Sequence, residues 1–98
     1  GGDNLLKSQA VDLAAIRAGT VELFEVKTSA STQDVYTAVG QLLIHGEGIS
    51  NLLDMPVRRF MVLPQQPHDH FIKPIGEELG AKIIIYREKA ASYVFDGL

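Results

Sequence analysis

The sequence predicts an α/β fold, a mixed β-sheet flanked by helices. Two observations predict it. First, strand-like segments rich in β-branched residues lie toward both ends of the chain. Second, two segments between them have apolar residues at helical spacing. The resulting order is β-β-α-β-α-β-β, and a helix joining two strands is typical of parallel pairing in a mixed sheet. With 98 residues the chain can build one core, so we expect a single domain over residues 1–98, a candidate fragment of a longer chain.

The first two predicted elements form a β-hairpin. Residues 8–17 have the composition of a strand, and Ala18-Gly19 marks a tight turn. Residues 20–28 (Thr-Val-Glu-Leu-Phe-Glu-Val-Lys-Thr) return as a second strand rich in β-branched and aromatic side chains.

A helix follows the hairpin. Ser31, with Asp34 three residues later, is typical of a capping box, which predicts Ser31 as the N-cap. Apolar residues then recur at helical spacing as far as His45. Gly46 resembles a C-terminal cap, so we expect the helix to end there and residues 49–57 to form a connection.

The second half of the chain supplies the remaining α and β elements. Residues 58–63 form a short apolar strand that ends at Pro64. Asp69 is a candidate cap for a helix over residues 70–79, which closes on Gly80. Residues 82–86 are apolar enough for a central strand, and residues 92–95 alternate like an edge strand.

Composition excludes several classes of protein. The chain is 46% hydrophobic and 21% charged, which excludes a disordered segment, and the absence of cysteine excludes disulfide scaffolds, thiolate zinc sites and cysteine nucleophiles. No run is long enough for a membrane span and no signal-peptide pattern is present, so we expect a cytoplasmic protein with no membrane partner. The formal charge of −3 counts weakly against nucleic-acid binding.

Three residues can form a site on the predicted hairpin. Glu25 and Lys27 are two apart on one strand and therefore share a face. A turn centred between Ala18 and Gly19 places Asp12 opposite Glu25 on that face. Two facing carboxylates suit a hard cation such as Mg²⁺ or Mn²⁺, for which the Val26 main-chain carbonyl is a natural third ligand. Lys27 can then orient or deprotonate a water, or stabilise charge on a phosphate.

These residues resemble the PD-(D/E)xK nuclease superfamily, whose members have the restriction-endonuclease-like fold. The similarity spans about residues 8–64, and Leu23-Phe24-Glu25-Val26-Lys27-Thr28 is very like the central motif. The resemblance implies Mg²⁺-dependent hydrolysis of a nucleic-acid phosphodiester, with DNA as the expected substrate and a restriction or defence role. It makes Asp12 and Glu25 the metal ligands and Lys27 the catalytic lysine.

Some branches of that superfamily carry a glutamine and then an aromatic residue four positions on, in the helix after the lysine strand. Gln41 matches the glutamine as a supporting catalytic residue, and His45 stands at the aromatic position. Two features depart from the pattern: Val11 replaces the usual proline before Asp12, and the first core helix of the family is missing here. Either this helix belongs to a missing part of a longer chain, which can also carry additional domains, or another subunit, as in a homodimer, covers the exposed sheet face.

Other readings of the sequence stay open. The chain can instead be a catalytically inactive module of the same fold that serves nucleic-acid binding or assembly. In His68-Asp69-His70 we favour a helix cap flanked by exposed histidines over a metal site. Arg58 and Arg59 are better explained as a solvated charge pair than as a phosphate contact, and His45 as a helix-end residue.

Overall fold

The computed structural model describes residues 10–89 and 92–96, with the backbone alone for residues 10–12, 88–89 and 92–96. Its strands are β1 (Ala10–Arg17), β2 (Thr20–Lys27), β3 (Val57–Leu63), β4 (Ala81–Lys89) and β5 (Ser92–Asp96). Its helices are α2 (Thr32–Leu53), α3 (Asp69–Lys73) and the π-helical segment η1 (Pro74–Glu78). This order of strands and helices matches the predicted one.

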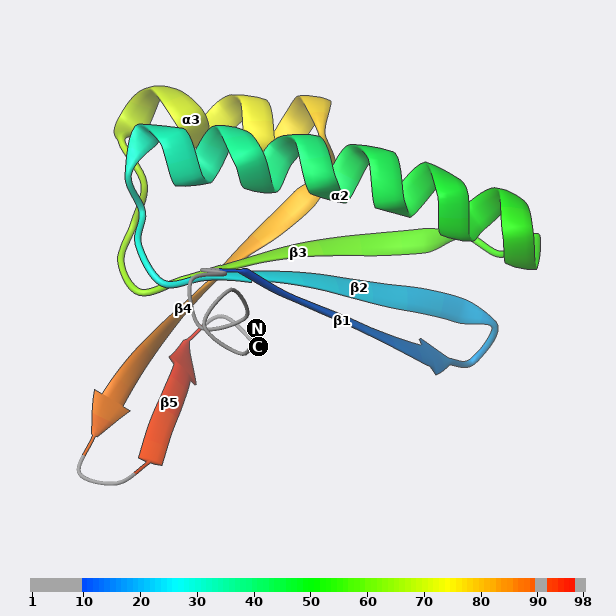
Figure 1. The fold of residues 1–98 in the computed structure, drawn as a ribbon, viewed down its shortest axis with the longest axis horizontal. Helices are drawn as coiled ribbons and strands as arrows, with labels where there is room; N and C mark the ends of the chain where they lie inside the picture. The colour runs from blue at the N-terminus through cyan, green and yellow to red at the C-terminus, as the bar shows by residue number, and fades with distance from the viewer. Residues whose placement is uncertain (1–9, 90–91, 97–98) are drawn as a thin grey trace, which may run out of the picture.

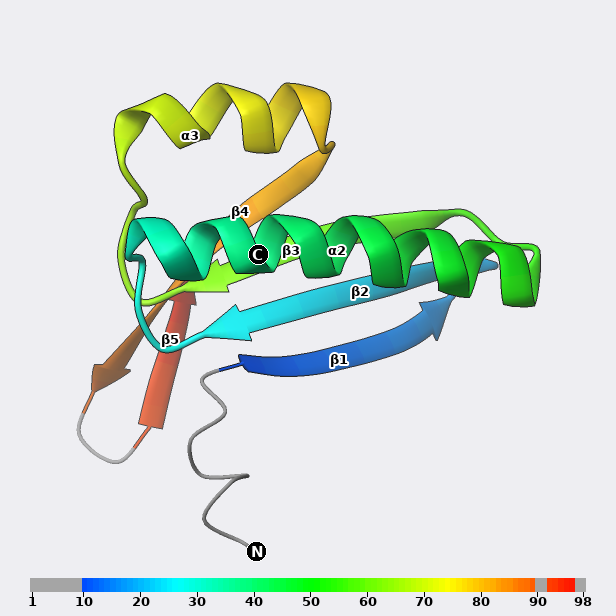
Figure 2. The same ribbon diagram turned by 45° about the horizontal axis from the view of Figure 1, so that its top comes forward.

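The strands form one mixed sheet in the order β1-β2-β3-β4-β5. The outer pairs β1–β2 and β4–β5 are antiparallel, and the inner pairs β2–β3 and β3–β4 are parallel. The α/β class with a mixed sheet is therefore confirmed, and β5 lies at an edge as expected. Helix α2 and the continuous α3–η1 segment lie on the same face of this sheet (Figures 1 and 2).

The β1–β2 hairpin has the predicted turn and register. Ala18 and Gly19 both have positive φ, at 53° and 79°, as the central residues of a type I′ turn require. Asp12 pairs directly with Glu25 across the two strands. The turn thus sets a register that brings the backbone positions of both predicted acids together.

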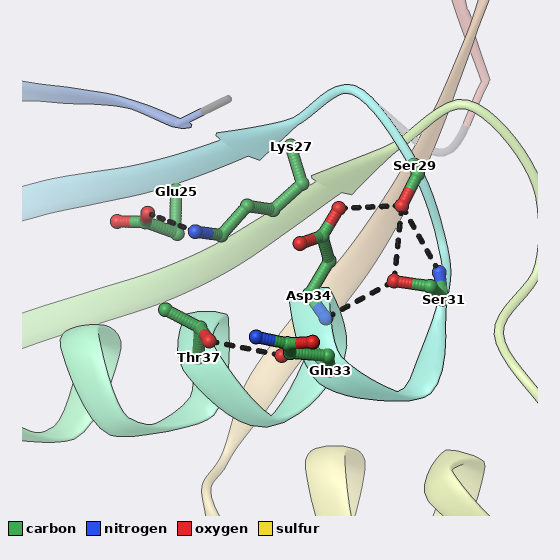
Figure 3. Close-up of polar contacts among 7 residues, drawn as sticks. All are labelled: Glu25, Lys27, Ser29, Ser31, Gln33, Asp34 and Thr37. Carbon is green, nitrogen blue, oxygen red and sulfur yellow. Dashed lines mark hydrogen bonds and ion pairs between the residues drawn. The ribbon is translucent and has the colours of Figure 1, made fainter. Parts of the chain in front are cut away.

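Helix α2 begins where the sequence predicts. The Ser31 hydroxyl accepts a hydrogen bond from the Asp34 N–H at 3.2 Å. Ser29 completes the cap, because its hydroxyl donates to the Asp34 carboxylate and accepts from the Ser31 N–H (Figure 3). The Asp34 charge also lies in the first turn, where the helix dipole favours it.

The predicted end of this helix at Gly46 is wrong, and so is the connection over residues 49–57. Helix α2 continues to Leu53 and ends at Asp54, whose φ of 53° is left-handed. Gly46 faces the sheet, where the Arg59 guanidinium lies 2.5–2.7 Å from the position a Cβ would take. The glycine therefore allows a strand side chain to approach the helix and does not mark a stop.

The second helical region starts at Asp69, one residue earlier than predicted, and changes from α-helical to π-helical hydrogen bonding at Pro74. His68 is the N-cap of α3, and Asp69 is its first helical residue rather than the cap. Pro74 has no N–H to donate and crowds the carbonyl four residues before it, which breaks the α-helical ladder. The chain continues as η1, where the Leu79 N–H donates to the Pro74 carbonyl at 3.0 Å, and closes at Gly80 with φ 72°.

The main core lies between the sheet and its two helices. Strand residues Leu23, Met61, Leu63 and Ala81 pack there against Val35, Ala38, Leu42, Phe71 and Ile75 of the helical layer. A smaller cluster lies on the other face of the sheet, around Phe60, Val62 and Ile84. In the described part of the chain, no helix is long and apolar enough to span a membrane.

Candidate functional site

Glu25 and Lys27 lie side by side under the first half of α2. Alternation along β2 places them on the helix-covered face together with Val21 and Leu23, as predicted. The Lys27 Nζ is 3.7 Å from the Glu25 Oε2, and the two side chains are only 5% and 1% exposed. Figure 3 shows both side chains reaching into the space between β2 and α2.

Burial of this pair has an energetic cost. Each charge loses its hydration, and a separation of 3.7 Å is longer than a strong hydrogen bond between charged groups. Replacing a buried ion pair with apolar residues of similar volume is often neutral or stabilising. An acid and a lysine on the helix-covered face of β2 therefore need a reason other than stability.

The backbone of Asp12, the third residue of the predicted site, lies where the sequence predicts. Asp12 is the direct partner of Glu25, while its side chain lies outside the described residues. Val26 pairs with Val11 on one side and with Val62 on the other, so its main chain lies within the sheet. The structure thus brings the Asp12, Glu25 and Val26 backbones to one place.

The described side chains hold no cluster of three His, Asp or Glu residues suited to a metal ion. The predicted ligands nevertheless have suitable chemistry, because carboxylate and carbonyl oxygens are the donors that Mg²⁺ and Mn²⁺ prefer. Glu25 supplies one such carboxylate on the covered face of β2, and Asp12 is aligned with it in the ladder.

Gln41 lies in the middle of α2, one helical turn after Thr37 and one before His45. Its Oε1 is buried and has no hydrogen-bond partner among the described residues. A buried amide oxygen without a partner costs about 1–3 kcal/mol. Burial of the Gln41 Oε1 is therefore unfavourable unless a donor reaches it.

His45 has a different position from the one that the sequence suggests. Because α2 continues to Leu53, His45 is a mid-helix residue. It lines a groove between α2 and β1 together with Ala14 and Leu23. The groove therefore runs along the helix-covered face beside the strand that carries Glu25.

Tyr86 contacts the predicted site, and nothing in the sequence indicated this contact. Its hydroxyl donates to the Lys27 carbonyl at 3.0 Å and so helps to hold the end of β2 that carries Lys27. The two residues lie on strands that are not neighbours in the sheet and are far apart in the chain, so no local pattern could have indicated the contact.

The other candidate groups have structural roles. His68 and His70 are exposed, and their Nδ1 atoms lie 2.7 Å apart beside the cap of α3. Arg58 is exposed and lies 3.8 Å from Glu22, as expected of a solvated charge. Arg59 differs, because it is half buried and its Nε donates to the Leu42 carbonyl at 2.9 Å.

Comparisons with protein-family models, curated proteins and solved structures found no match to this chain. Functional inference therefore depends on the residues of the site and their arrangement.

Proposed function

We propose that this chain is a metal-dependent nuclease domain of the PD-(D/E)xK type that hydrolyses phosphodiester bonds in DNA. One observation carries the proposal. Glu25 and Lys27 are buried together on the covered face of β2, and Asp12 stands opposite Glu25 in the hairpin ladder. This is the arrangement that the motif requires, and a purely structural sheet has no need of it.

The ladder supports the proposed metal ligands. Directly paired residues of an antiparallel hairpin have Cβ atoms about 5 Å apart on one face, which suits two carboxylates that share a cation. We assign Asp12, Glu25 and the Val26 carbonyl to Mg²⁺, for which Mn²⁺ is a suitable substitute. When bound, the ion would supply charge neutralisation at the scissile phosphate and lower the pKa of a bound water.

We assign Lys27 the role of a proton carrier or phosphate ligand, which requires its buried amine to become accessible to the substrate. Its amine is held beside Glu25, and Tyr86 fixes the main chain from which it extends. In the reaction it would orient the attacking water or stabilise charge on the phosphate oxygens. Gln41, with its buried unpartnered Oε1, would accept a hydrogen bond from that water or from the Lys27 amine.

A second candidate is an inactive module of the same fold that binds nucleic acid or assembles with other chains. The burial of the pair favours it, because side chains only 1% and 5% exposed do not reach a substrate phosphate in this conformation. The acidic composition, with 12 acids against 9 bases, favours it as well.

Calorimetry with Mn²⁺ separates the two candidates without knowledge of the substrate. We expect the wild-type chain to bind Mn²⁺ and Glu25→Gln to lose that binding. Glu47→Gln, which removes an exposed acid on α2, serves as the matched control and should bind as wild type does. Absence of binding in the wild-type chain would favour the inactive module.

Cleavage of supercoiled plasmid DNA with Mg²⁺ then tests the lysine. Lys27→Met keeps the buried volume but removes the amine, and we expect a loss of at least about 100-fold, in the range of general acid–base effects. Lys82→Met removes an exposed lysine of β4 and should cleave normally. Cleavage by Lys27→Met at the wild-type rate would refute the assigned role, provided that circular dichroism shows both variants folded.

A further inference from the structure

The outer edge of β1 and the neighbouring side of α2 form an exposed apolar surface. Leu13 and Ile16 of β1 are 54% and 59% exposed, and Ile44 and Leu52 of α2 are 69% and 83% exposed. A groove of about 460 Å³ lies between the two elements, with Ala14 among the residues of its wall. Figure 2 shows β1 as the outermost strand on this side of α2.

The two faces of β1 can be assigned from its pairing with β2. Ala14 pairs with Leu23 and Ile16 with Val21, and both partners are buried on the helix-covered face. Ala14 and Ile16 therefore lie on the same face as the groove. The small residue Ala14 in the groove wall is thus followed, two positions later on the same face, by the large exposed residue Ile16.

The central part of the β1 edge, residues 13–16, lacks the features that normally block strand addition, although the charged residues Asp12 and Arg17 flank it. Natural edge strands carry charges, prolines or bulges that prevent pairing with another chain. Residues 13–16 are Leu-Ala-Ala-Ile, and the ladder with β2 is regular throughout. Among the described residues no strand pairs with this edge.

We propose that the edge is covered by β1 of a second copy of this chain, which extends the sheet across a two-fold axis at Ala15. In this register Ala15 pairs with its own counterpart, and Ile16 of each copy lies opposite Ala14 of the other. Each large side chain then enters the groove that the small residue leaves open. The same contact forms twice, as an isologous interface requires.

Symmetry restricts the choice of register. A two-fold axis between antiparallel strands is perpendicular to the sheet, so paired residues must lie on the same face in both copies. An axis at Ala14 also meets this condition, but it pairs Ile16 with Asp12 and leaves alanine opposite alanine in the groove. Of these two, the axis at Ala15 matches large with small and apolar with apolar on the groove face, while on the other face it pairs Leu13 with the aliphatic part of Arg17.

The exposed area agrees with a dimer. Leu13, Ile16, Ile44 and Leu52 together expose on the order of 500 Å² of apolar side chain in each copy. If all four side chains were fully covered in both copies, the dimer would bury about 1,000 Å², which is at the lower limit of specific protein interfaces, and the main-chain hydrogen bonds of the added strands would be additional.

Cysteine cross-linking tests the interface directly, because the chain contains no cysteine of its own. Ala15→Cys places two thiols opposite each other at the axis, so mild oxidation should give a covalent dimer. Ala14→Cys is the matched control on the same exposed strand, and we expect its cross-linking to be slower, because its two copies are offset by two residues and lie about 8 Å apart, beyond the reach of a disulfide. Equal rates, or faster cross-linking of Ala14→Cys, would overturn the proposed register.

Molar mass in solution provides the second test. We expect light scattering to give twice the chain mass of 10.7 kDa for wild type and the single chain mass for Ile16→Lys. Ile72→Lys changes an exposed isoleucine on α3 and should remain a dimer, while circular dichroism checks that both variants fold. A monomeric wild type, or a dimer unaffected by Ile16→Lys, would overturn the proposal.

Discussion

Gly46→Ala is expected to destabilise the protein, although alanine is the better helix former. The added Cβ would lie 2.5–2.7 Å from the Arg59 guanidinium, so that side chain must move. Its Nε then loses the hydrogen bond to the Leu42 carbonyl, which is worth about 1.5–3 kcal/mol for a charged donor. The higher helix propensity of alanine offsets about 1 kcal/mol of this loss in the free energy of unfolding. The net effect is a loss of about 1 kcal/mol in the free energy of unfolding.

Gly48 provides the matched control, because it lies in the same helix and a Cβ there meets nothing within 4 Å. Gly48→Ala should therefore raise the free energy of unfolding by up to about 1 kcal/mol. Urea denaturation followed by circular dichroism resolves the expected gap of about 2 kcal/mol between the two variants.

A double-mutant cycle with Arg59→Ala tests the stated cause. Without the guanidinium, Gly46→Ala should become stabilising by up to about 1 kcal/mol, as at Gly48. If Gly46→Ala has the same effect with and without Arg59, or stabilises the otherwise unchanged protein, the contact does not determine the choice of glycine.

Three further variants test local features of the fold by the same urea assay. Ser31→Ala removes the cap of α2 and should cost about 1 kcal/mol. Ala18→Asn should stabilise the hairpin by roughly 0.5–1 kcal/mol, because asparagine tolerates the left-handed backbone that alanine adopts there; no gain would contradict this reading of the turn. Tyr86→Phe removes the hydrogen bond to the Lys27 carbonyl and should cost about 1 kcal/mol, whereas an unchanged midpoint would show that this bond contributes nothing.

The hairpin and its register were predictable because the determining signals are local. Ala18-Gly19 can form a two-residue turn, and once the turn is placed, simple counting pairs Asp12 with Glu25. Alternation along β2 then assigns Glu25 and Lys27 to one face. The predicted site depends only on these short-range rules, which is why its backbone arrangement agrees with the structure.

The length of α2 was not predictable in the same way. A glycine at position 46 is typical of a helix end. Only the contact with the Arg59 side chain, which extends from β3, shows why glycine is needed inside the helix. The error also misplaced His45, which the longer helix puts in the groove wall. Contacts between distant elements decided these features, as they did for Tyr86 and Lys27.

The proposed dimer and the proposed nuclease site together predict how DNA would be cut. With the axis at Ala15, strand geometry places the two copies of Glu25 about 25 Å apart on the same face of a continuous sheet. The two strands of a DNA duplex are themselves related by two-fold axes, so such a dimer can present one site to each strand.

Wild-type protein should therefore convert supercoiled plasmid to the linear form with little nicked intermediate, whereas monomeric Ile16→Lys should accumulate nicked circles. Ile72→Lys controls for an added surface charge and should behave as wild type does. If monomeric Ile16→Lys still linearises plasmid without a nicked intermediate, the two sites do not act as a pair on one duplex, and the dimer would have to serve stability alone.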